Sequence, residues 1–178
     1  TTAGHRARRF FLPVLALIAA SVVIAADTSE LAPLASKSLL LAATRVGDKL
    51  VAVGDRGHVL LSSDQGRTWT QSQVPTRALL TGVSFADATH GWAVGHDGVI
   101  LATTDGGLTW THQDNGKNLD IVYLDVLFLS ASHGFAVGAY GKFSITTDGG
   151  KTWTPAKPSS DEVHYNRIAA GPDGYLYL

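Results

Sequence analysis

The stretch that decides the fold is Ser62-Ser63-Asp64-Gln65-Gly66-Arg67-Thr68-Trp69. It returns as Thr103-Thr104-Asp105-Gly106-Gly107-Leu108-Thr109-Trp110 and again as Thr146-Thr147-Asp148-Gly149-Gly150-Lys151-Thr152-Trp153. The shared pattern is (Ser/Thr)-x-Asp-x-Gly-x-Thr-Trp, and its three tryptophans lie 41 and 43 positions apart. Self-similarity with a period near about 40 residues indicates a solenoid or a propeller.

Each copy has the composition of a hairpin turn. The aspartate is expected to accept hydrogen bonds from backbone N–H groups two or three residues further on. The glycine supplies a positive φ, and the tryptophan begins the next strand with an indole N–H that needs an acceptor. We therefore predict a structural role for the repeated positions, which are Asp64, Gly66, Trp69, Asp105, Gly107, Trp110, Asp148, Gly150 and Trp153.

The repeated pattern resembles the Asp-box, or BNR repeat, of sialidases and other β-propellers. A second repeated element precedes each copy and comprises residues 50–54, Gly91-Trp92-Ala93-Val94-Gly95 and Gly134-Phe135-Ala136-Val137-Gly138. Together the two elements resemble the photosystem II stability/assembly factor family over residues 38–178. This resemblance implies a non-enzymatic propeller without a cofactor. Its partner would be a client protein, such as a subunit of a membrane complex during assembly.

Short segments rich in Val, Thr, Trp and Gly predict an all-β fold built from four-stranded propeller blades. The blades are predicted near residues 38–75, 79–114, 121–158 and 165–178. Their expected strands are 39–45, 49–54, 58–63 and 69–73, then 80–85, 91–95, 99–104 and 110–113, then 122–129, 134–138, 142–147 and 153–157, and finally 166–170 and 175–178. Propellers close with roughly four to eight blades. We therefore expect part of a larger propeller, for which the resemblance implies seven blades, with the pairing of two chains as the alternative.

Residues 1–26 have the pattern of a helical secretory signal peptide, with a basic stretch at 5–9, an apolar run at 10–25 and small residues before Asp27. The apolar run is shorter than the roughly 20 residues of a spanning helix, although an uncleaved anchor is the alternative. Arg8-Arg9-Phe10-Phe11-Leu12 resembles the twin-arginine signal, and the general secretory route is the other reading. Residues 27–37 are predicted as a linker. Together these features predict export to the periplasm, or to a compartment like the thylakoid lumen in a photosynthetic source.

Composition argues against several classes of function. The chain has no cysteine, so disulfides and thiolate metal sites are excluded. Its seven histidines are not closely paired in sequence, which gives no metal-binding pattern. The formal net charge is −1, and no cluster of basic residues in the repeats suggests a nucleic-acid partner.

The order of the strands predicts a candidate binding surface. In an antiparallel blade, the box turns between the third and fourth strands lie at one end. The turns between the second and third strands lie at the other end, together with the connections between blades. Variable loops on a rigid scaffold commonly form binding sites. The predicted client contacts at this end are Arg56, Arg77, His96, Asp97 and Tyr140. The arginines suit a carboxylate-bearing client, and solvated surface arginines are the alternative.

A secreted glycosidase, sialidase-like or glucanase-like, is the alternative function because sialidases also carry Asp-boxes. Such enzymes use a tyrosine nucleophile paired with glutamate, an acid/base aspartate and an arginine triad. The glutamates here are Glu30 and Glu162, and Arg45, Arg56, Arg67 and Arg77 all fall in or just after the first blade. No catalytic set can be assembled from these residues, so the rest of such a set would have to lie in further blades.

Overall fold

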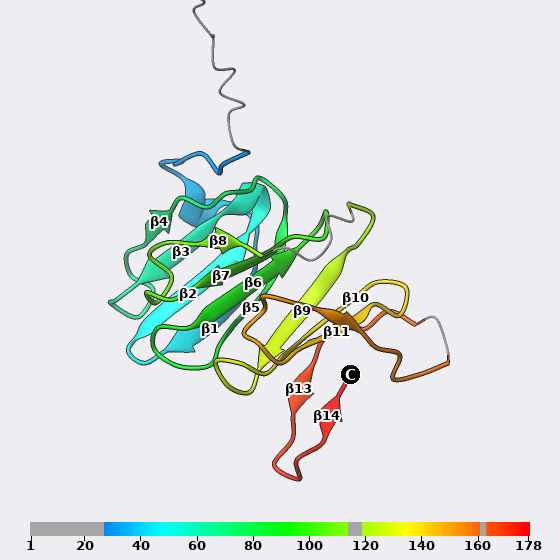
Figure 1. Cartoon of the computed structure of the whole chain (residues 1–178). Helices are drawn as coiled ribbons and strands as arrows, with labels where there is room; N and C mark the ends of the chain where they lie inside the picture. Colours follow the sequence, from blue (N-terminus) through cyan, green and yellow to red (C-terminus); the bar gives the residue numbers. More distant parts are fainter. Residues whose placement is uncertain (1–26, 114–118, 161–162) are drawn as a thin grey trace, which may run out of the picture.

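The computed structural model describes residues 27–113, 119–160 and 163–178, and the predicted signal peptide lies outside them. The described chain is mainly β structure, with successive sheets following one another in chain order (Figure 1). Blade one contains β1 (Leu40–Val46), β2 (Lys49–Gly54), β3 (Val59–Ser62) and β4 (Thr70–Ser72). Blade two contains β5 (Leu80–Phe85), β6 (Gly91–Gly95), β7 (Ile100–Thr103) and β8 (Thr111–His112). Blade three contains β9 (Tyr123–Phe128), β10 (Gly134–Gly138), β11 (Phe143–Thr146) and β12 (Thr154–Pro155).

Two further strands, β13 (Ala169–Ala170) and β14 (Leu176–Tyr177), form a two-stranded sheet where a fourth blade would begin. Two 3-10 turns, η1 (Ala35–Lys37) and η2 (Asp55–Gly57), complete the described elements. The larger sheets have the antiparallel orders β1-β2-β3-β4, β5-β6-β7-β8 and β9-β10-β11-β12. The predicted all-β architecture of four-stranded blades is therefore confirmed.

The strands agree with the sequence-based expectation best at the second strand of each blade. β2, β6 and β10 have the predicted bounds, whereas the last strand of each blade is shorter than predicted. Trp69, Trp110 and Trp153 were expected to begin these strands, but each lies one residue before them. The cause is local, because the tryptophan belongs to the box turn and packs beneath it. In blade three, Pro155 also lacks the N–H that a continuing ladder would use.

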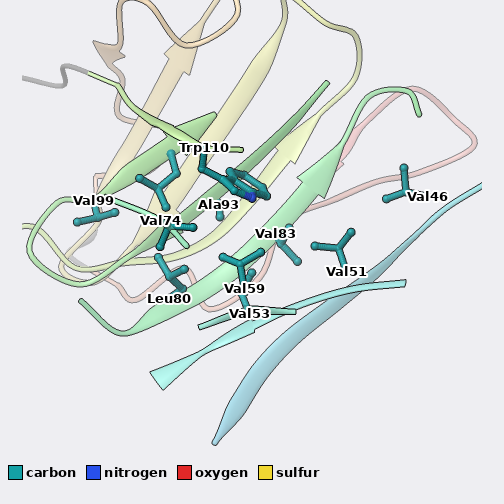
Figure 2. Close-up of a cluster of buried hydrophobic side chains, with 11 residues drawn as sticks. Val46, Val51, Val53, Val59, Val74, Leu80, Val83, Ala93, Val99 and Trp110 are labelled. Atoms are coloured by element: carbon teal, nitrogen blue, oxygen red, sulfur yellow. The ribbon is translucent and has the colours of Figure 1, made fainter. Parts of the chain in front are cut away.

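The hydrophobic core lies between neighbouring blades. The first cluster joins Val51, Val53 and Val59 of blade one to Leu80 and Ala93 of blade two, and Figure 2 shows these side chains meeting. Similar clusters join blades two and three, and blade three and the following segment. Because the middle strands are covered on both faces, they read as nearly continuous apolar runs and not as alternating ones.

Glycines in the second strands allow close approach of the chain. A Cβ at Gly95 would lie 2.1 Å from the Leu79 carbonyl oxygen, and one at Gly138 would lie 2.1 Å from that of Val122. The register of the first strand shifts beside each contact, between Leu80 and Gly82 in blade two. The glycine that ends each of these strands therefore has a steric cause in the backbone.

Residues 29–38, which we call the strap, pack against blade one although residues 27–37 were predicted as a linker. The Ser29 N–H donates to the Val74 carbonyl at 2.9 Å, and the Ser29 hydroxyl accepts from the Val74 N–H at 2.9 Å. Gln71 Nε2 donates to the Glu30 carbonyl at 2.8 Å. Ser29 is fully buried and Ala35 is 3% exposed. Ala32 and Ala35 of the strap pack in one cluster with Ala52 and Leu60 of β2 and β3, so the strap covers part of blade one. Within the residues that the structure describes, no helix is long and apolar enough to span a membrane.

Candidate functional site

The box aspartates close their own turns. Asp105 Oδ1 accepts hydrogen bonds from the Thr109 N–H at 2.9 Å and from the Thr103 hydroxyl at 2.8 Å, and its Oδ2 accepts from the Thr109 hydroxyl at 2.5 Å. The Thr103 hydroxyl in turn accepts from the Gly107 N–H at 3.0 Å. The expected reach of two or three residues is only partly right. The Leu108 backbone, three positions on, also bonds to the Asp105 carboxylate, but its main partners are Thr109, four positions on, and the Thr103 hydroxyl, two positions before it.

The same network recurs in the other two boxes. Asp64 bonds to Thr68 and Ser62, and Asp148 bonds to Thr152 and Thr146. Hydrogen bonds from Thr68 lower the pKa of Asp64 to about 2, and those from Thr152 lower the pKa of Asp148 to about 2. Burial raises the pKa of Asp105, but the bonds from Thr109 and Thr103 outweigh it and leave a pKa of about 2. The carboxylates are thus held ionised by groups of their own turns, which fits structural anchors and not proton donors.

The boxes also fasten one blade to the next. Gly66, Gly107 and Gly150 have φ values of 85°, 91° and 88°, as predicted. The Trp110 indole N–H donates to the Gly107 carbonyl at 2.9 Å, and the Ser72 hydroxyl of blade one reaches the same carbonyl at 2.8 Å. The Trp92 indole N–H of blade two donates to the Gly149 carbonyl of the third box at 2.9 Å. Within the described part of the chain, Trp153 Nε1 is buried without an acceptor.

The hydrogen bonds place the two kinds of turn at opposite ends of a blade. At the box end, Gly106 N–H donates to the Thr89 carbonyl in the β5–β6 turn at 2.9 Å. His90 in that turn donates its N–H to Asp87, which is a turn role for the position before Gly91. At the other end, Gly57 N–H donates at 2.9 Å to the Ala78 carbonyl in the connection between blades. We call this second end the loop face. It includes Arg56, whereas Arg67 lies in the box turn beyond the far end of β3.

The structure distributes the five predicted contacts over the loop face without bringing them into one pocket. Arg56 lies 3.5 Å from its neighbour Asp55, and Arg77 lies 3.0 Å from Glu30 of the strap. Both pairs are exposed, and such pairs contribute roughly 0–1 kcal/mol. His96 is half-buried, and Asp97 beside it is exposed. Tyr140 is 76% exposed, and its ring centroid lies 4.8 Å from that of His164.

A shallow groove of about 370 Å³ lies between the strap and the η2 turn. Its apolar lining residues are Ala32, Leu34 and Leu39, and its polar ones are Lys37, Ser38, Asp55, Arg56 and His58. His58 is 5% exposed, and its Nδ1 lies 2.7 Å from the Ser38 hydroxyl. Burial is the main cause that lowers the pKa of His58, so the ring is neutral at pH 7 and the groove's positive charge comes from Lys37 and Arg56.

Sequence reasoning missed Lys37 and His58 as members of this surface, whereas His164 lies in the connection 161–165 that was expected at this end. Lys37 belongs to a segment interpreted as a linker. A weak signal existed for His58, because it follows the turn glycine between second and third strands, a position that Val99 and Lys142 occupy in the other blades. In the residues that the structure describes, no group of three or more histidine, aspartate or glutamate side chains could hold a metal ion.

Three antiparallel blades with interlocked boxes define the class of the protein, an Asp-box β-propeller fold. The family described as Photosynthesis system II assembly factor YCF48 matches residues 61–121, and the BNR/Asp-box repeat matches residues 144–155. These matches confirm the resemblance to photosystem II assembly factor-like propellers. No curated protein matches the chain.

Solved structures share the fold. YCF48 bound to a D1 peptide is 22% identical with a TM-score of 0.65, and the match covers 76% of this chain and 44% of that one. YCF48 from Cyanidioschyzon merolae is 26% identical with a TM-score of 0.61, covering 73% and 43%. An ancestral GH74 enzyme is 17% identical with a TM-score of 0.55, covering 67% and 19%, which is a likeness of fold. The chain thus spans less than half the length of either YCF48 structure.

Proposed function

We propose that this protein is an exported, non-enzymatic scaffold that binds a client protein during assembly of a membrane complex. The observation that carries the proposal is the assembly-factor match over residues 61–121, which includes the Gly-Trp-Ala-Val-Gly strand and the box of blade two. A structure of the same fold holds a D1 peptide, which makes a peptide segment of the client a reasonable ligand here too.

The loop face supports this role by its chemistry. Its exposed side chains include Arg56, Asp97 and Tyr140 on the turns between second and third strands, and Arg77 on a connection between blades, and the turns are hydrogen-bonded to the connections. Arg56 and Arg77 each hold a carboxylate already, through weak exposed pairs. A client carboxylate could replace these partners at little cost, because an exposed pair contributes roughly 0–1 kcal/mol.

Affinity purification of the tagged full-length protein from its native membranes tests the proposal. We expect subunits or assembly intermediates of one membrane complex to copurify, and the yield to fall as salt rises because exposed charge pairs are screened over about 8–10 Å. Arg56→Glu should reduce the yield several-fold, whereas Arg67→Glu in the first box should not. Arg77→Glu would face Glu30, so it is tested together with Glu30→Gln. If Arg67→Glu were the damaging change, the binding face would be misassigned.

The export that the first 26 residues suggest has its own test. Cell fractionation and immunoblotting of the full chain expressed in a bacterium should find it in the periplasmic or membrane fraction. Replacing Arg8 and Arg9 by lysines should block export if the twin-arginine route is used, and leave it intact for the general secretory route. Recovery of the chain in the cytoplasm alone would contradict export.

The glycosidase alternative is tested on the same purified protein. Hydrolysis of a sialoside or a β-glucan that persists through purification would contradict the scaffold proposal. The likeness to an ancestral GH74 enzyme concerns the fold and leaves that assay to decide.

A further inference from the structure

The three turns between second and third strands share one backbone. Arg56, Asp97 and Tyr140 occupy the same turn position with φ values of 53°, 56° and 54°. Each is followed by a glycine, with φ of 69° at Gly57, 64° at Gly98 and 69° at Gly141. Two successive residues with positive φ define a type I′ turn, for which Asn-Gly is a preferred pair.

These turns are held rigidly by their surroundings. The turn glycines donate their N–H groups to the connections between blades, with Gly98 to Ile121 at 2.7 Å and Gly141 to Val163 at 2.6 Å. In the first blade a Cβ at Gly57 would lie 2.2 Å from the Thr76 carbonyl oxygen. The side chain that precedes each glycine is therefore presented at a fixed place.

That side chain is exposed in all three blades, and it differs each time. The left-handed conformation costs a residue with a Cβ roughly 1–2 kcal/mol. Asparagine or glycine would fit with less strain, yet Arg56 and Tyr140 occupy two of the positions. Arg56 contacts the neighbouring Asp55, and Tyr140 contacts the His164 ring, so neither fills a core. Strained, exposed side chains on a rigid frame are typical of recognition surfaces.

The surroundings give each position its own chemistry. Arg56 lines the groove of about 370 Å³ together with Lys37 and the apolar Leu34 and Leu39. This end suits an acidic residue with an apolar neighbour. At the blade-three end, the Tyr140 and His164 rings form an exposed aromatic surface that suits a proline or an aromatic ring. Asp97 of blade two lies between them in blade order and suits a basic residue.

We infer that the three turns read one extended client segment in order: an acidic residue at Arg56 and Lys37, a basic residue at Asp97, and a ring at Tyr140 and His164. This inference rests on the proposed scaffold function and adds the chemical class and order of what is bound. Each blade contributes one side chain, so specificity comes from the differences between otherwise equal turns.

Selection of a displayed random-peptide library on the immobilised full-length protein tests this order. Peptides joined to the display protein at their C-terminus have no free carboxylate there, so enrichment must come from side chains. We expect enriched peptides to combine acidic, basic and ring-bearing residues in one order. Arg56→Asn, Asp97→Asn and Tyr140→Asn should each weaken an enriched peptide about tenfold or more, without lowering the melting temperature, because asparagine tolerates the turn. Arg67→Asn is the matched control at the box end.

Charge exchange makes the result position-specific. Selection on Arg56→Glu should replace the acidic residue by a basic one, and selection on Asp97→Lys should replace the basic residue by an acidic one. The inference is wrong if no peptide is enriched, or if enriched peptides bind the three asparagine variants as well as the wild type. In either case the scaffold proposal still depends on the separate copurification of a client, so the two failures are distinguishable.

Discussion

The Trp92 side chain offers a test of how the blades are joined. Trp92 belongs to β6 but is 2% exposed, because its ring stacks on Phe128 of blade three with centroids 3.4 Å apart and planes 3° apart. Its indole N–H donates to the Gly149 carbonyl of the third box. One side chain thus stacks on the first strand of the following blade and donates a hydrogen bond to the box of that blade.

Two substitutions separate these contributions. Trp92→Phe keeps a ring for stacking but leaves the Gly149 carbonyl without this donor, at a cost of about 1–2 kcal/mol. Trp92→Ala also removes the stacked ring and should cost about 3–5 kcal/mol. For a domain of this size, about 1 kcal/mol corresponds to roughly 2–4 °C in melting temperature. We therefore expect a loss of roughly 2–8 °C for phenylalanine and a clearly larger loss for alanine.

Hydrogen exchange measured by mass spectrometry shows where stability is lost. In Trp92→Phe, the amides of Gly150 and Thr152 in the third box should lose protection, while those of the first box should not. The matched control is Trp110→Phe, whose N–H serves its own box, so its loss should centre on the second box. Unchanged exchange in the third box of Trp92→Phe would refute the idea that this bond couples the blades. Equal losses for phenylalanine and alanine would refute the role of the stack.

Three further predictions concern the turns and the first and second strands of the blades. The box aspartates have folded pKa values of about 2, against about 3.9 unfolded, so their stabilisation is present above about pH 4 and lost as the pH falls towards 2. Asp105→Asn should make the measured unfolding free energy less dependent on pH in that window, and an unchanged slope would contradict this. Gly95→Ala should strongly reduce soluble expression, because its Cβ would lie 2.1 Å from the Leu79 carbonyl oxygen. Gly47→Ala is the control: its Cβ would have no atom within 4 Å, and the φ of 60° should lower the unfolding free energy by only about 1 kcal/mol. Asp125 is buried and accepts hydrogen bonds from the Val126 and Ile168 N–H groups. Asp125→Ala should therefore lower the unfolding free energy measured in urea by about 1–3 kcal/mol and loosen the segment after blade three. An unchanged unfolding free energy would show that water replaces the carboxylate.

Local repetition explains how much of the fold could be predicted. The glycines that flank β6 and β10 mark both ends of these strands, and each has a neighbour that a Cβ would displace, so sequence and structure agree there. The box could be recognised as a turn from its residue types. Its bonding pattern could not, because residue types alone do not specify that the Ser62 hydroxyl donates to Asp64 and accepts from the Gly66 N–H.

Contacts between distant parts of the chain could not be predicted. Ser29 bonds to Val74 across 45 residues, and no periodicity marks either residue as a partner. The same segment supplies Glu30 to Arg77, so the carboxylate that pairs with this predicted client contact comes from residues interpreted as a linker. The groove at Arg56 also depends on the strap, because Ala32, Leu34, Lys37 and Ser38 form much of its lining. An interpretation of residues 27–37 as a linker necessarily misses that site.

The repeats separate stability from recognition between the two ends of each blade. At the box end, the same bonding network recurs three times with Asp64, Asp105 and Asp148, and its polar groups bond within the turn or to the preceding blade. At the loop face, the backbone recurs but the exposed residue changes from arginine to aspartate to tyrosine. Repetition of both backbone and side chain is what a structural device requires, because every blade meets the same packing problem. Repetition of the backbone alone, with a different exposed side chain each time, has no such cause in packing and is what reading different groups of one ligand would require.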